Sequence, residues 1–333
     1  MSENPSRAAT PPVAVVMAVR DEARSLEAAV DAVLAQEYPG SYEVCIAVGP
    51  STDGTERIAA DLAARDSRVR VVANPAGITP AGLNTAIGAS GGEVVARVDG
   101  HAILPPGYVR RAVDLLEETG ADNVGGVMAA EGDTPFTRAV AAAMTSRFGT
   151  GDARFHTGGP PGEVDTVYLG VFRRKALERV GGYDESLVRA QDAELNHRLR
   201  ASGGTVYFHP DLRVAYRPRG SLRALGRQYF QYGRWRRVIV RRHPGSLAWR
   251  QMAAPFMLIA NALGLALGLS GRRLGWLAPV GYVGALGVGS ALARDDLDAA
   301  SLRWLPIVFA TMHAAWGVGF LTSPPSLAAS EHV

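Results

Sequence analysis

The chain has 333 residues, 47% of them hydrophobic and 20% charged, so it can bury a sizeable core and is not disordered as a whole. Its formal net charge is only +3, and we expect no nucleic-acid partner. A single cysteine, Cys45, excludes a framework of intramolecular disulfides, and its apolar neighbours indicate a core residue.

From residue 12 onward, short apolar runs alternate with helical patterns. The preceding residues, 1–11, are polar and lack the apolar stretch of a signal peptide, so we expect a short flexible tail there. The apolar runs predict four strands: Val13–Val19, Tyr42–Val48, Val69–Ala73 and Val94–Val98. The stretches between them predict three helices: Arg24–Gln36, Thr55–Arg65 and Thr79–Ala89. This alternation predicts an α/β fold with a mainly parallel sheet and helices on both faces.

Acidic residues follow three of the four predicted strands. Ligands of such sheets bind beyond the carboxyl ends of the strands. An Asp or Gly after one strand is ordinary turn chemistry. Several carboxylates at one edge are costly, however, unless a cation or a donor-rich ligand neutralises them. We therefore predict a ligand site at this edge, with these residues: Asp21, Glu22, Asp53, Asp99 and His101.

The segment Asp99-Gly100-His101 comes directly after the fourth predicted strand. If it is extended, Asp99 and His101 face one point, and Gly100 lets a ligand approach the backbone. A carboxylate and an imidazole form part of a coordination sphere, and its open positions suit water and phosphate oxygens. The imidazole shifts the preference from Mg²⁺ toward Mn²⁺. The alternative, which the spacing alone favours, is a turn in which Asp99 caps the next helix and His101 is incidental.

Five ordered segments within about residues 12–245 resemble the motifs of glycosyltransferase family 2, whose members have the GT-A fold. They are VMAVRDEARSLEAAV, CIAVGPSTDGT, NPAGITPAGLNTAIGASGGE, DGH and GGYDESLVRAQDAELNHRLRASGG. The segments RVDGHAILPPGYV, VDTVYLGVFRRKAL and GRW are most similar to the ExoA-type branch, membrane-associated glycosyltransferases of exopolysaccharide assembly. The resemblance implies a Rossmann-like GT-A catalytic domain over residues 12–215.

The resemblance also implies roles for individual residues. On the donor side it places Val19, Arg20, Glu22, Asp53, Asn84, Asp99 and Gly100, with Glu22 and Asp53 holding the nucleoside. Asp99 would ligate Mn²⁺ or Mg²⁺, with His101 in place of the usual second Asp. Asp192 would be the general base, taking the proton of the acceptor hydroxyl as its oxygen attacks the anomeric carbon opposite the leaving diphosphate. Such attack inverts the configuration, and the metal and nearby Arg residues would stabilise the departing nucleoside diphosphate.

The sequence departs from the family pattern at two places. Val48-Gly49 stands where the second loop usually has Asp-Asp, so one nucleoside contact is missing and uridine is less strongly indicated. Gln191-Asp192 replaces the usual Glu-Asp, and because Gln cannot act as a base, Asp192 is the candidate. Without the resemblance, Asp192 would be interpreted as a first-turn acid that the helix dipole stabilises.

Residues 213–250 contain eleven Arg and no acidic residue. Within them, QYGRW resembles the Q-x-x-R-W motif of membrane-bound family-2 enzymes, which lines the acceptor or diphosphate side. The residues predicted on that side are Gln191, Gln231, Arg234 and Trp235. The alternative is that residues 216–250 form interfacial helices that bind anionic lipid headgroups, and the two roles are compatible.

Three stretches without charge follow, 252–270, 274–293 and 304–330, the last with one histidine. Each is long enough to cross a hydrocarbon core of roughly 30 Å, and their Gly and Pro suit membrane helices. We expect three membrane helices over residues 251–325; three buried helices of a soluble domain are the alternative. The preceding Arg-rich stretch predicts a cytoplasmic catalytic domain on the inner or plasma membrane. Arg272-Arg273 would then lie outside, against the same rule, unless the first hairpin dips in without crossing.

Together these features predict an inverting, metal-dependent glycosyltransferase at the membrane face. It would move a hexose from a nucleotide sugar to a lipid-linked saccharide or a growing glycan. The first donor to expect is UDP-glucose. One alternative is direct transfer to polyprenyl phosphate. Another is an inactive GT-A-like membrane scaffold, which the changes at Gly49 and Gln191 support.

Overall fold

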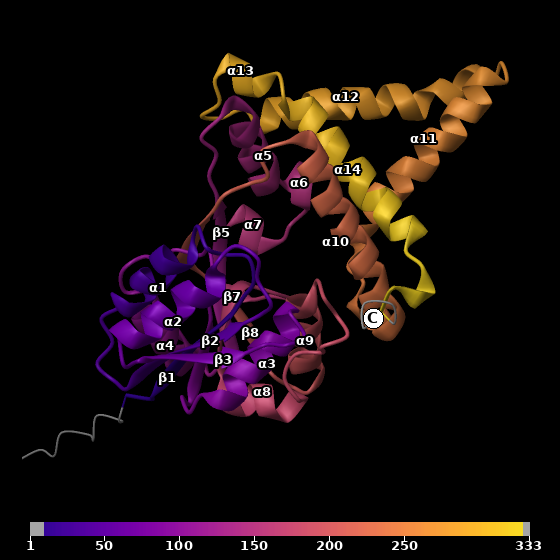
Figure 1. Ribbon diagram of the computed structural model, residues 1–333. Helices are drawn as coiled ribbons and strands as arrows, with labels where there is room; N and C mark the ends of the chain where they lie inside the picture. The colour runs from indigo at the N-terminus through magenta and orange to yellow at the C-terminus, as the bar shows by residue number, and fades with distance from the viewer. Residues whose placement is uncertain (1–9, 329–333) are drawn as a thin grey trace, which may run out of the picture. The chain divides into compact units, whose positions relative to one another are not determined.

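The computed structural model describes residues 10–328, which divide into two compact units. The first unit combines the residues up to Val127 with Gly159–Val214, and the second combines Met128–Gly158 with the residues from Ala215 onward (Figure 1). The second unit thus includes a segment that the sequence places within the domain 12–215. Most of the tail expected over residues 1–11 lies outside the described residues.

An eight-stranded sheet forms the core of the first unit, in the order β3-β2-β1-β4-β7-β5-β8-β6. The strands are β1 Val13–Val19, β2 Tyr42–Val48, β3 Val69–Ala73, β4 Val94–Arg97, β5 Asn123–Ala130, β6 Gly162–Glu163, β7 Tyr168–Arg173 and β8 Val206–Tyr216. β1 pairs in parallel with β2 and β4, and β2 with β3, as the four apolar runs predict. β7 is antiparallel to both β4 and β5, so the remainder of the sheet is mixed.

Helices cover both faces of this sheet. They are α1 Leu26–Leu34, α2 Thr55–Arg65, α3 Thr79–Ala89, α4 Tyr108–Thr119, α8 Arg174–Val180 and α9 Gln191–Ala201. On one face, Val15 and Met17 of β1 belong to the same buried cluster as side chains of α1 and α4. On the other face α3 approaches closely, because a Cβ on Gly82 would lie 2.8 Å from the Cβ of Ala18. The predicted α/β architecture is therefore confirmed.

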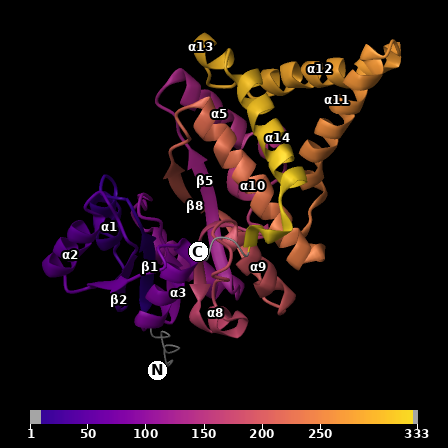
Figure 2. The same ribbon diagram turned by 45° about the vertical axis from the view of Figure 1, so that its right-hand side comes forward.

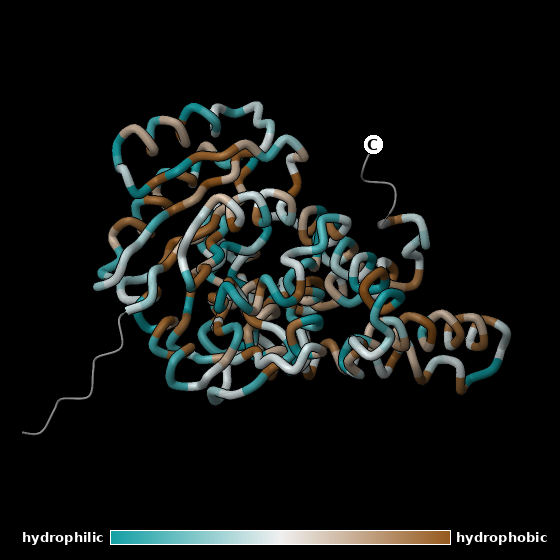
Figure 3. Tube along the Cα trace, turned by 90° about the horizontal axis from the view of Figure 1, so that it is seen from below, coloured by the Kyte–Doolittle hydropathy of each residue, from teal (hydrophilic) through white to brown (hydrophobic). Residues whose placement is uncertain are grey.

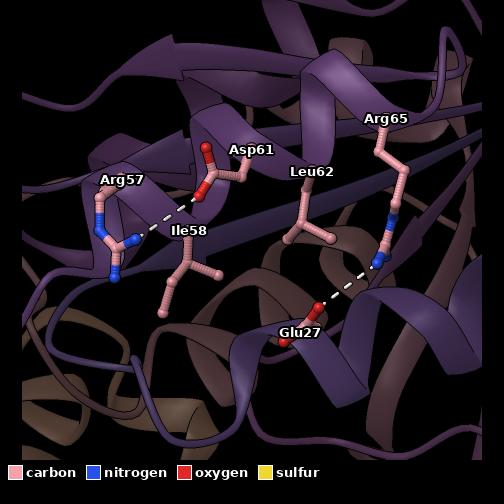
Figure 4. A pocket seen from close by; sticks show the side chains of 6 residues that line it. All are labelled: Glu27, Arg57, Ile58, Asp61, Leu62 and Arg65. Carbon is pink, nitrogen blue, oxygen red and sulfur yellow. Dashed lines mark hydrogen bonds and ion pairs between the residues drawn. The ribbon is translucent and has the colours of Figure 1, made fainter.

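A pocket lies between α1 and α2 (Figure 4). Its lining residues are Glu27, Arg57, Ile58, Asp61, Leu62 and Arg65. The charged groups in it pair with one another, Arg57 with Asp61 at 3.9 Å and Arg65 with Glu27 at 3.3 Å. None of the predicted site residues lines this pocket; they lie at the ends of the strands, in α3 and α9, and in α10 (Leu222–Arg242).

The second unit is mainly helical. Its helices are α5 Pro135–Thr145, α6 Arg147–Thr150, α7 Arg154–Thr157, α10 Leu222–Arg242, α11 Ala253–Leu269, α12 Leu277–Leu292, α13 Ala299–Leu302 and α14 Leu305–Thr322. Three helical segments are long and apolar enough to cross a membrane: Trp249–Leu269, Arg273–Leu292 and Ala299–Thr322. Within this unit α10 and α14 lie side by side (Figures 1 and 2).

Candidate functional site

The loops that follow β1 and β2 are tied together through Asp53. Its Oδ2 accepts a hydrogen bond from the Ala23 N–H at 2.9 Å, and its Oδ1 accepts one from the Thr55 hydroxyl at 2.6 Å. The bond from Thr55, followed by that from Ala23, lowers the pKa of Asp53 below its usual value. The Thr55 hydroxyl in turn accepts the N–H of Glu22 at 2.8 Å. Asp53 thus binds the loop after β1 through Oδ2 and the start of the following helix α2 through Oδ1, in both cases through neutral donors.

The residues between β1 and Glu22 adopt a strained, partly exposed turn. Asp21 has a φ of 55°, in the left-handed region, and its Oδ1 accepts the Thr52 N–H at 2.8 Å. Arg20 is half-exposed and its Nη1 lies 3.5 Å from the carbonyl oxygen of Gly77. Val19 is buried at the end of β1. Of the predicted donor-side residues, Arg20 is therefore open to solvent and Val19 is part of the core.

The segment from Asp99 to His101 is a turn, not the extended segment on which the facing of the two side chains depends. The Ala102 N–H donates to the Asp99 carbonyl at 2.9 Å and closes this turn. A Cβ on Gly100 would lie 3.1 Å from the Cγ of Glu22, so glycine lets the turn pack against the end of β1. The space beside the Cα of Gly100 is therefore filled by Val19 and Glu22, and not left open to a ligand as the sequence suggests.

His101 pairs with Glu22 across the two strand ends. The His101 Nδ1 lies 2.9 Å from Glu22 Oε1, and the Ser25 hydroxyl donates to Glu22 Oε2 at 2.7 Å. Burial opposes the charge of Glu22, but the hydrogen bonds from His101 and Ser25 outweigh it and lower the pKa of Glu22. Glu22 is therefore a carboxylate at neutral pH that orients the imidazole.

Arg97, the last residue of β4, joins two of the predicted site residues. Its side chain is only 9% exposed, and its Nε and Nη2 donate to Asp99 Oδ1 at 3.1 and 2.9 Å. Its Nη1 donates to Asp192 Oδ1. Burial opposes the charge of Arg97, yet the neighbouring Asp99 raises its pKa, so the guanidinium stays protonated. Asp99 and Asp192 are thus brought together on one buried cation.

Helix α9 presents one of its two first-turn carboxylates to Arg97. Ala190, just before it, has a φ of 59°, and Gln191 at its start is buried. Asp192 is 42% exposed and reaches Arg97. Glu194 is 1% exposed and binds Arg198 through both oxygens, at 2.7 and 2.8 Å. As its spacing on a helix predicts, Glu194 faces away from the site.

Asn84 clamps the segment that carries Tyr183. Its Nδ2 donates to the Tyr183 carbonyl at 2.9 Å and to Glu185 Oε1 at 2.8 Å, and its Oδ1 accepts the Tyr183 N–H at 2.8 Å. The hydroxyl of Tyr183 is buried and has no hydrogen-bond partner among the described residues. Burial raises its pKa to about 12, and the charges of Arg97 and Asp99 also act on it.

Two further residues of this site, Arg97 and Tyr183, are not among those that the sequence predicts. Arg97 stands in an otherwise apolar run, two residues before Asp99, and an isolated charge at that spacing is a usable signal. Tyr183 lies in the GGYDE segment, whose resemblance to the family motif points to its carboxylates and not to its tyrosine. Arg97 binds both Asp99 and Asp192, and Tyr183 is close enough for the charges of Arg97 and Asp99 to act on its hydroxyl.

Three of the four residues predicted on the acceptor side, Gln231, Arg234 and Trp235, lie in α10 of the second unit, whereas Gln191 begins α9 of the first unit. The Arg234 guanidinium lies 5.5 Å from the centre of the Phe230 ring, and the Arg234 carbonyl accepts the Ser323 hydroxyl at 2.9 Å. Trp235 is only 1% exposed, whereas Gln231 is half-buried. Their role beside the acceptor stays a prediction, because the contacts of Arg234 are with residues of the second unit.

The donors available to a metal are few. Among residues 10–328, no three or more His, Cys, Asp and Glu side chains gather as a metal site. Arg97 donates to Asp99 Oδ1, and the exposed His101 follows Asp99 two residues later in the chain. This donor set fits an ion that takes most of its ligands from water and a diphosphate, not a closed protein site.

Residues 14–181 match the family model described as Glycosyl transferase family 2. The succinoglycan biosynthesis protein ExoA of Rhizobium meliloti (strain 1021) is 33% identical over 312 residues, 92% of this chain and 93% of that protein. Glycosyltransferase AglE of Haloferax volcanii is 27% identical over 228 residues, 67% of this chain and 72% of that protein. The solved mannosyltransferase PcManGT from Pyrobaculum calidifontis, in complex with GDP-Man and Mn²⁺, shares the fold with a TM-score of 0.63. It is 20% identical, with 95% of this chain and 88% of that chain covered. The chain therefore belongs to glycosyltransferase family 2, and it is a glycosyltransferase with a GT-A fold.

Proposed function

We propose that this glycosyltransferase moves a hexose from a nucleotide sugar to a lipid-linked saccharide or a growing glycan, with inversion and with a divalent ion. Its place would be the cytoplasmic face of the inner or plasma membrane. The observation that carries the proposal is the meeting of Asp99 and Asp192 on Arg97. Both carboxylates bind the same guanidinium. Asp99 would act through the metal on the donor diphosphate, and Asp192 would act on the acceptor hydroxyl.

Asp192 is the residue that moves the proton. Its carboxylate accepts the proton of the acceptor hydroxyl while the oxygen attacks the anomeric carbon, a timing that suits a weak base. Asp192 can accept this proton only as a carboxylate, which is the form that pairs with the guanidinium of Arg97. Attack from the face opposite the diphosphate inverts the anomeric configuration.

Asp99 Oδ2 and His101 would hold Mn²⁺ or Mg²⁺, with the imidazole favouring Mn²⁺. When bound, the ion supplies positive charge for the leaving diphosphate. Glu22 would orient the imidazole through its 2.9 Å contact with Nδ1. The GDP-Man and Mn²⁺ seen in PcManGT support a nucleotide sugar and this class of ion.

The donor nucleotide would lie over the interlocked loops after β1 and β2. Glu22 and Asp53 would accept hydrogen bonds from ribose or base donors through the remaining lone pairs of their carboxylate oxygens, and the side chain of Arg20 is exposed. UDP-glucose is the first donor to test, and GDP-mannose the second because PcManGT binds it. The printed role of ExoA in succinoglycan biosynthesis supports a growing glycan as the acceptor, with Gln231, Arg234 and Trp235 on its side.

A donor screen on the detergent-solubilised protein tests the proposal. With Mn²⁺ present, we expect release of nucleoside diphosphate from one donor of a UDP- and GDP-sugar panel, faster with a lipid-linked saccharide than with polyprenyl phosphate. Asp99→Ala should weaken Mn²⁺-dependent donor binding at least about tenfold. The matched control is Asp61→Asn, an exposed carboxylate of α2, which should match the wild type. Wild-type protein that binds no donor in Mn²⁺ would support the scaffold alternative instead.

A further inference from the structure

Helices α10 and α14 pack against each other backbone to backbone. The bare Cα of Gly233 faces the carbonyl of Trp316, and that of Gly319 faces the carbonyl of Phe230, with no room for a Cβ at either place. Small residues at such crossings let helices approach closely. α10 and α14 are therefore one tightly packed pair (Figures 1 and 2).

The two helices run in the same direction along most of α14. Near the middle of α14, Thr311 lies beside Gly226. At its C-terminal end, Arg241 donates from Nη2 to the Ser323 carbonyl at 2.6 Å and from Nη1 to the Pro324 carbonyl at 3.0 Å. If α14 lies in the hydrocarbon of a membrane from Thr311 to its end, the neighbouring α10 must therefore lie at the same depth.

Helix α10 carries arginine along its whole length and no acidic residue. The arginines are Arg223, Arg227, Arg234, Arg236, Arg237, Arg241 and Arg242. Residues near a helix end can extend their charge to the membrane surface, but Arg234 lies in the middle of α10. An arginine within the hydrocarbon is strongly disfavoured. A bilayer crossing by α14 would draw these side chains into the hydrocarbon with it.

Helices α11 and α12 have the opposite character. Neither contains a charged residue, and large apolar side chains are exposed along both. They include Phe256, Leu263, Leu269, Leu277, Val280, Val283, Val288 and Leu292. The tube of α11 and α12 is mostly pale to brown in Figure 3, as their residue hydropathy requires. The segments to which they belong have 21 and 20 residues, which at about 1.5 Å per residue span the hydrocarbon. A helix that is apolar and exposed all round is a membrane span.

The hairpin touches α14 at separate places. A Cβ on Gly317 would lie 2.6 Å from the Leu258 side chain of α11, whereas the Tyr282 hydroxyl of α12 lies 3.2 Å from His313 Nδ1. The turn of the hairpin points away from α14, so that α11, α12 and α14 form a triangle with α14 as its base (Figure 1). α14 thus runs across the open end of the hairpin.

We propose that α11 and α12 cross the bilayer as a helical hairpin, whereas α14 does not cross and lies with α10 at the membrane surface. The exposed arginines of α10, Arg223, Arg227, Arg241 and Arg242, then meet the lipid headgroups. This revises the expected three membrane helices over residues 251–325. It rests on the membrane location in the proposed function but not on the transfer chemistry. The end of α14 must then lie on the same side of the membrane as the catalytic unit, because α10 follows that unit without an intervening span.

Three serine-to-cysteine variants test this topology in the full chain. Ser67→Cys marks the catalytic unit, Ser270→Cys marks the turn between α11 and α12, and Ser326→Cys marks the segment after α14; all three serines are exposed. Cys45 is buried, so the wild-type chain is the unlabelled control. With a membrane-impermeant maleimide, we expect Ser270→Cys to react on one face, and the other two to react on the opposite face.

Each pairing of labels decides one part of the proposal. Reaction of Ser326→Cys on the same face as Ser270→Cys would show that α14 crosses and would overturn it. Reaction of all three on one face would show that the hairpin does not cross, and would also overturn it. A reporter fused to the C-terminus, active on one side of the membrane only, gives a second reading without any substitution. Loss of transferase activity would change none of these outcomes.

Discussion

Two groups of carboxylates lie at the same edge of the sheet, and the protein holds them in different ways. Asp53 is bound by two neutral donors, the backbone N–H of Ala23 in the loop after β1 and the hydroxyl of Thr55 at the start of α2. Asp99 and Asp192 are both bound by the charged Arg97. Neutral donors fix the shape of a loop, whereas one cation shared by two anions makes each anion sensitive to the other.

The difference separates architecture from chemistry at this edge. Replacing Asp53 disturbs the tie between two loops, and its effect on transfer passes through donor binding. Replacing a group bound to Arg97 changes the charge balance at the place where the proton moves. Substitutions at Asp192 and Arg97 should therefore have larger effects on transfer than a substitution at Asp53.

The largest effect is expected from Asp192→Asn. An amide cannot accept the proton of the acceptor hydroxyl, so the turnover number should fall by about 10²–10⁴. The Michaelis constant for the donor should change little, because Asp192 acts on the acceptor. Initial rates with the donor identified by the screen measure both quantities, with Asp61→Asn as the control. An Asp192→Asn enzyme with wild-type turnover would remove Asp192 from the role of base.

Arg97 should have the next largest effect. Arg97→Gln leaves two partly exposed carboxylates without their cation, and we expect a loss of about 1–3 kcal/mol in unfolding free energy with a tenfold or greater fall in turnover. Arg97→Lys keeps the charge but cannot direct a planar fork at two partners, so its turnover should be intermediate.

Thermal unfolding and initial rates of the two Arg97 variants distinguish a structural role from a positioning role. If Arg97→Lys recovers stability but not turnover, the fork geometry matters for the reaction. If both variants lose stability and keep the wild-type turnover, the arginine is a purely structural element of β4 and the contrast with Asp53 fails.

Much of the fold was predictable because apolar runs of five to seven residues that alternate with helical patterns predict the strands of a parallel sheet. The bounds Val13–Val19, Tyr42–Val48 and Val69–Ala73 are those of β1, β2 and β3. The antiparallel position of β7 between β4 and β5 was not predictable, because its partners lie far away in the sequence. Local periodicity carries no information about such distant pairing.

The site was predictable at the level of which segments meet, and less so for geometry. Strand ends brought Glu22, Asp53 and Asp99 to one edge, as parallel pairing requires. The metal interpretation of Asp99 and His101 requires an extended backbone, whereas the spacing alone favours a turn, and the N–H of Ala102 closes a turn there. A two-residue spacing has meaning only when the backbone conformation is known. Arg97 was overlooked because a single charge does not break an apolar pattern.

The smallest effect is expected from Asp53→Asn, and it appears in the pH dependence of stability. Hydrogen bonds lower the pKa of Asp53 below its usual 3.8, so the unfolded chain takes up a proton there before the folded chain does. The contribution of Asp53 is therefore present above about pH 4 and is lost as the pH falls through the lowered pKa. Asn does not titrate, so the difference in melting temperature between wild type and variant should shrink from pH 7 to pH 3. Thermal unfolding of the solubilised proteins at stepped pH measures this difference. A gap that stays constant would mean that the carboxylate charge does not hold the two loops together.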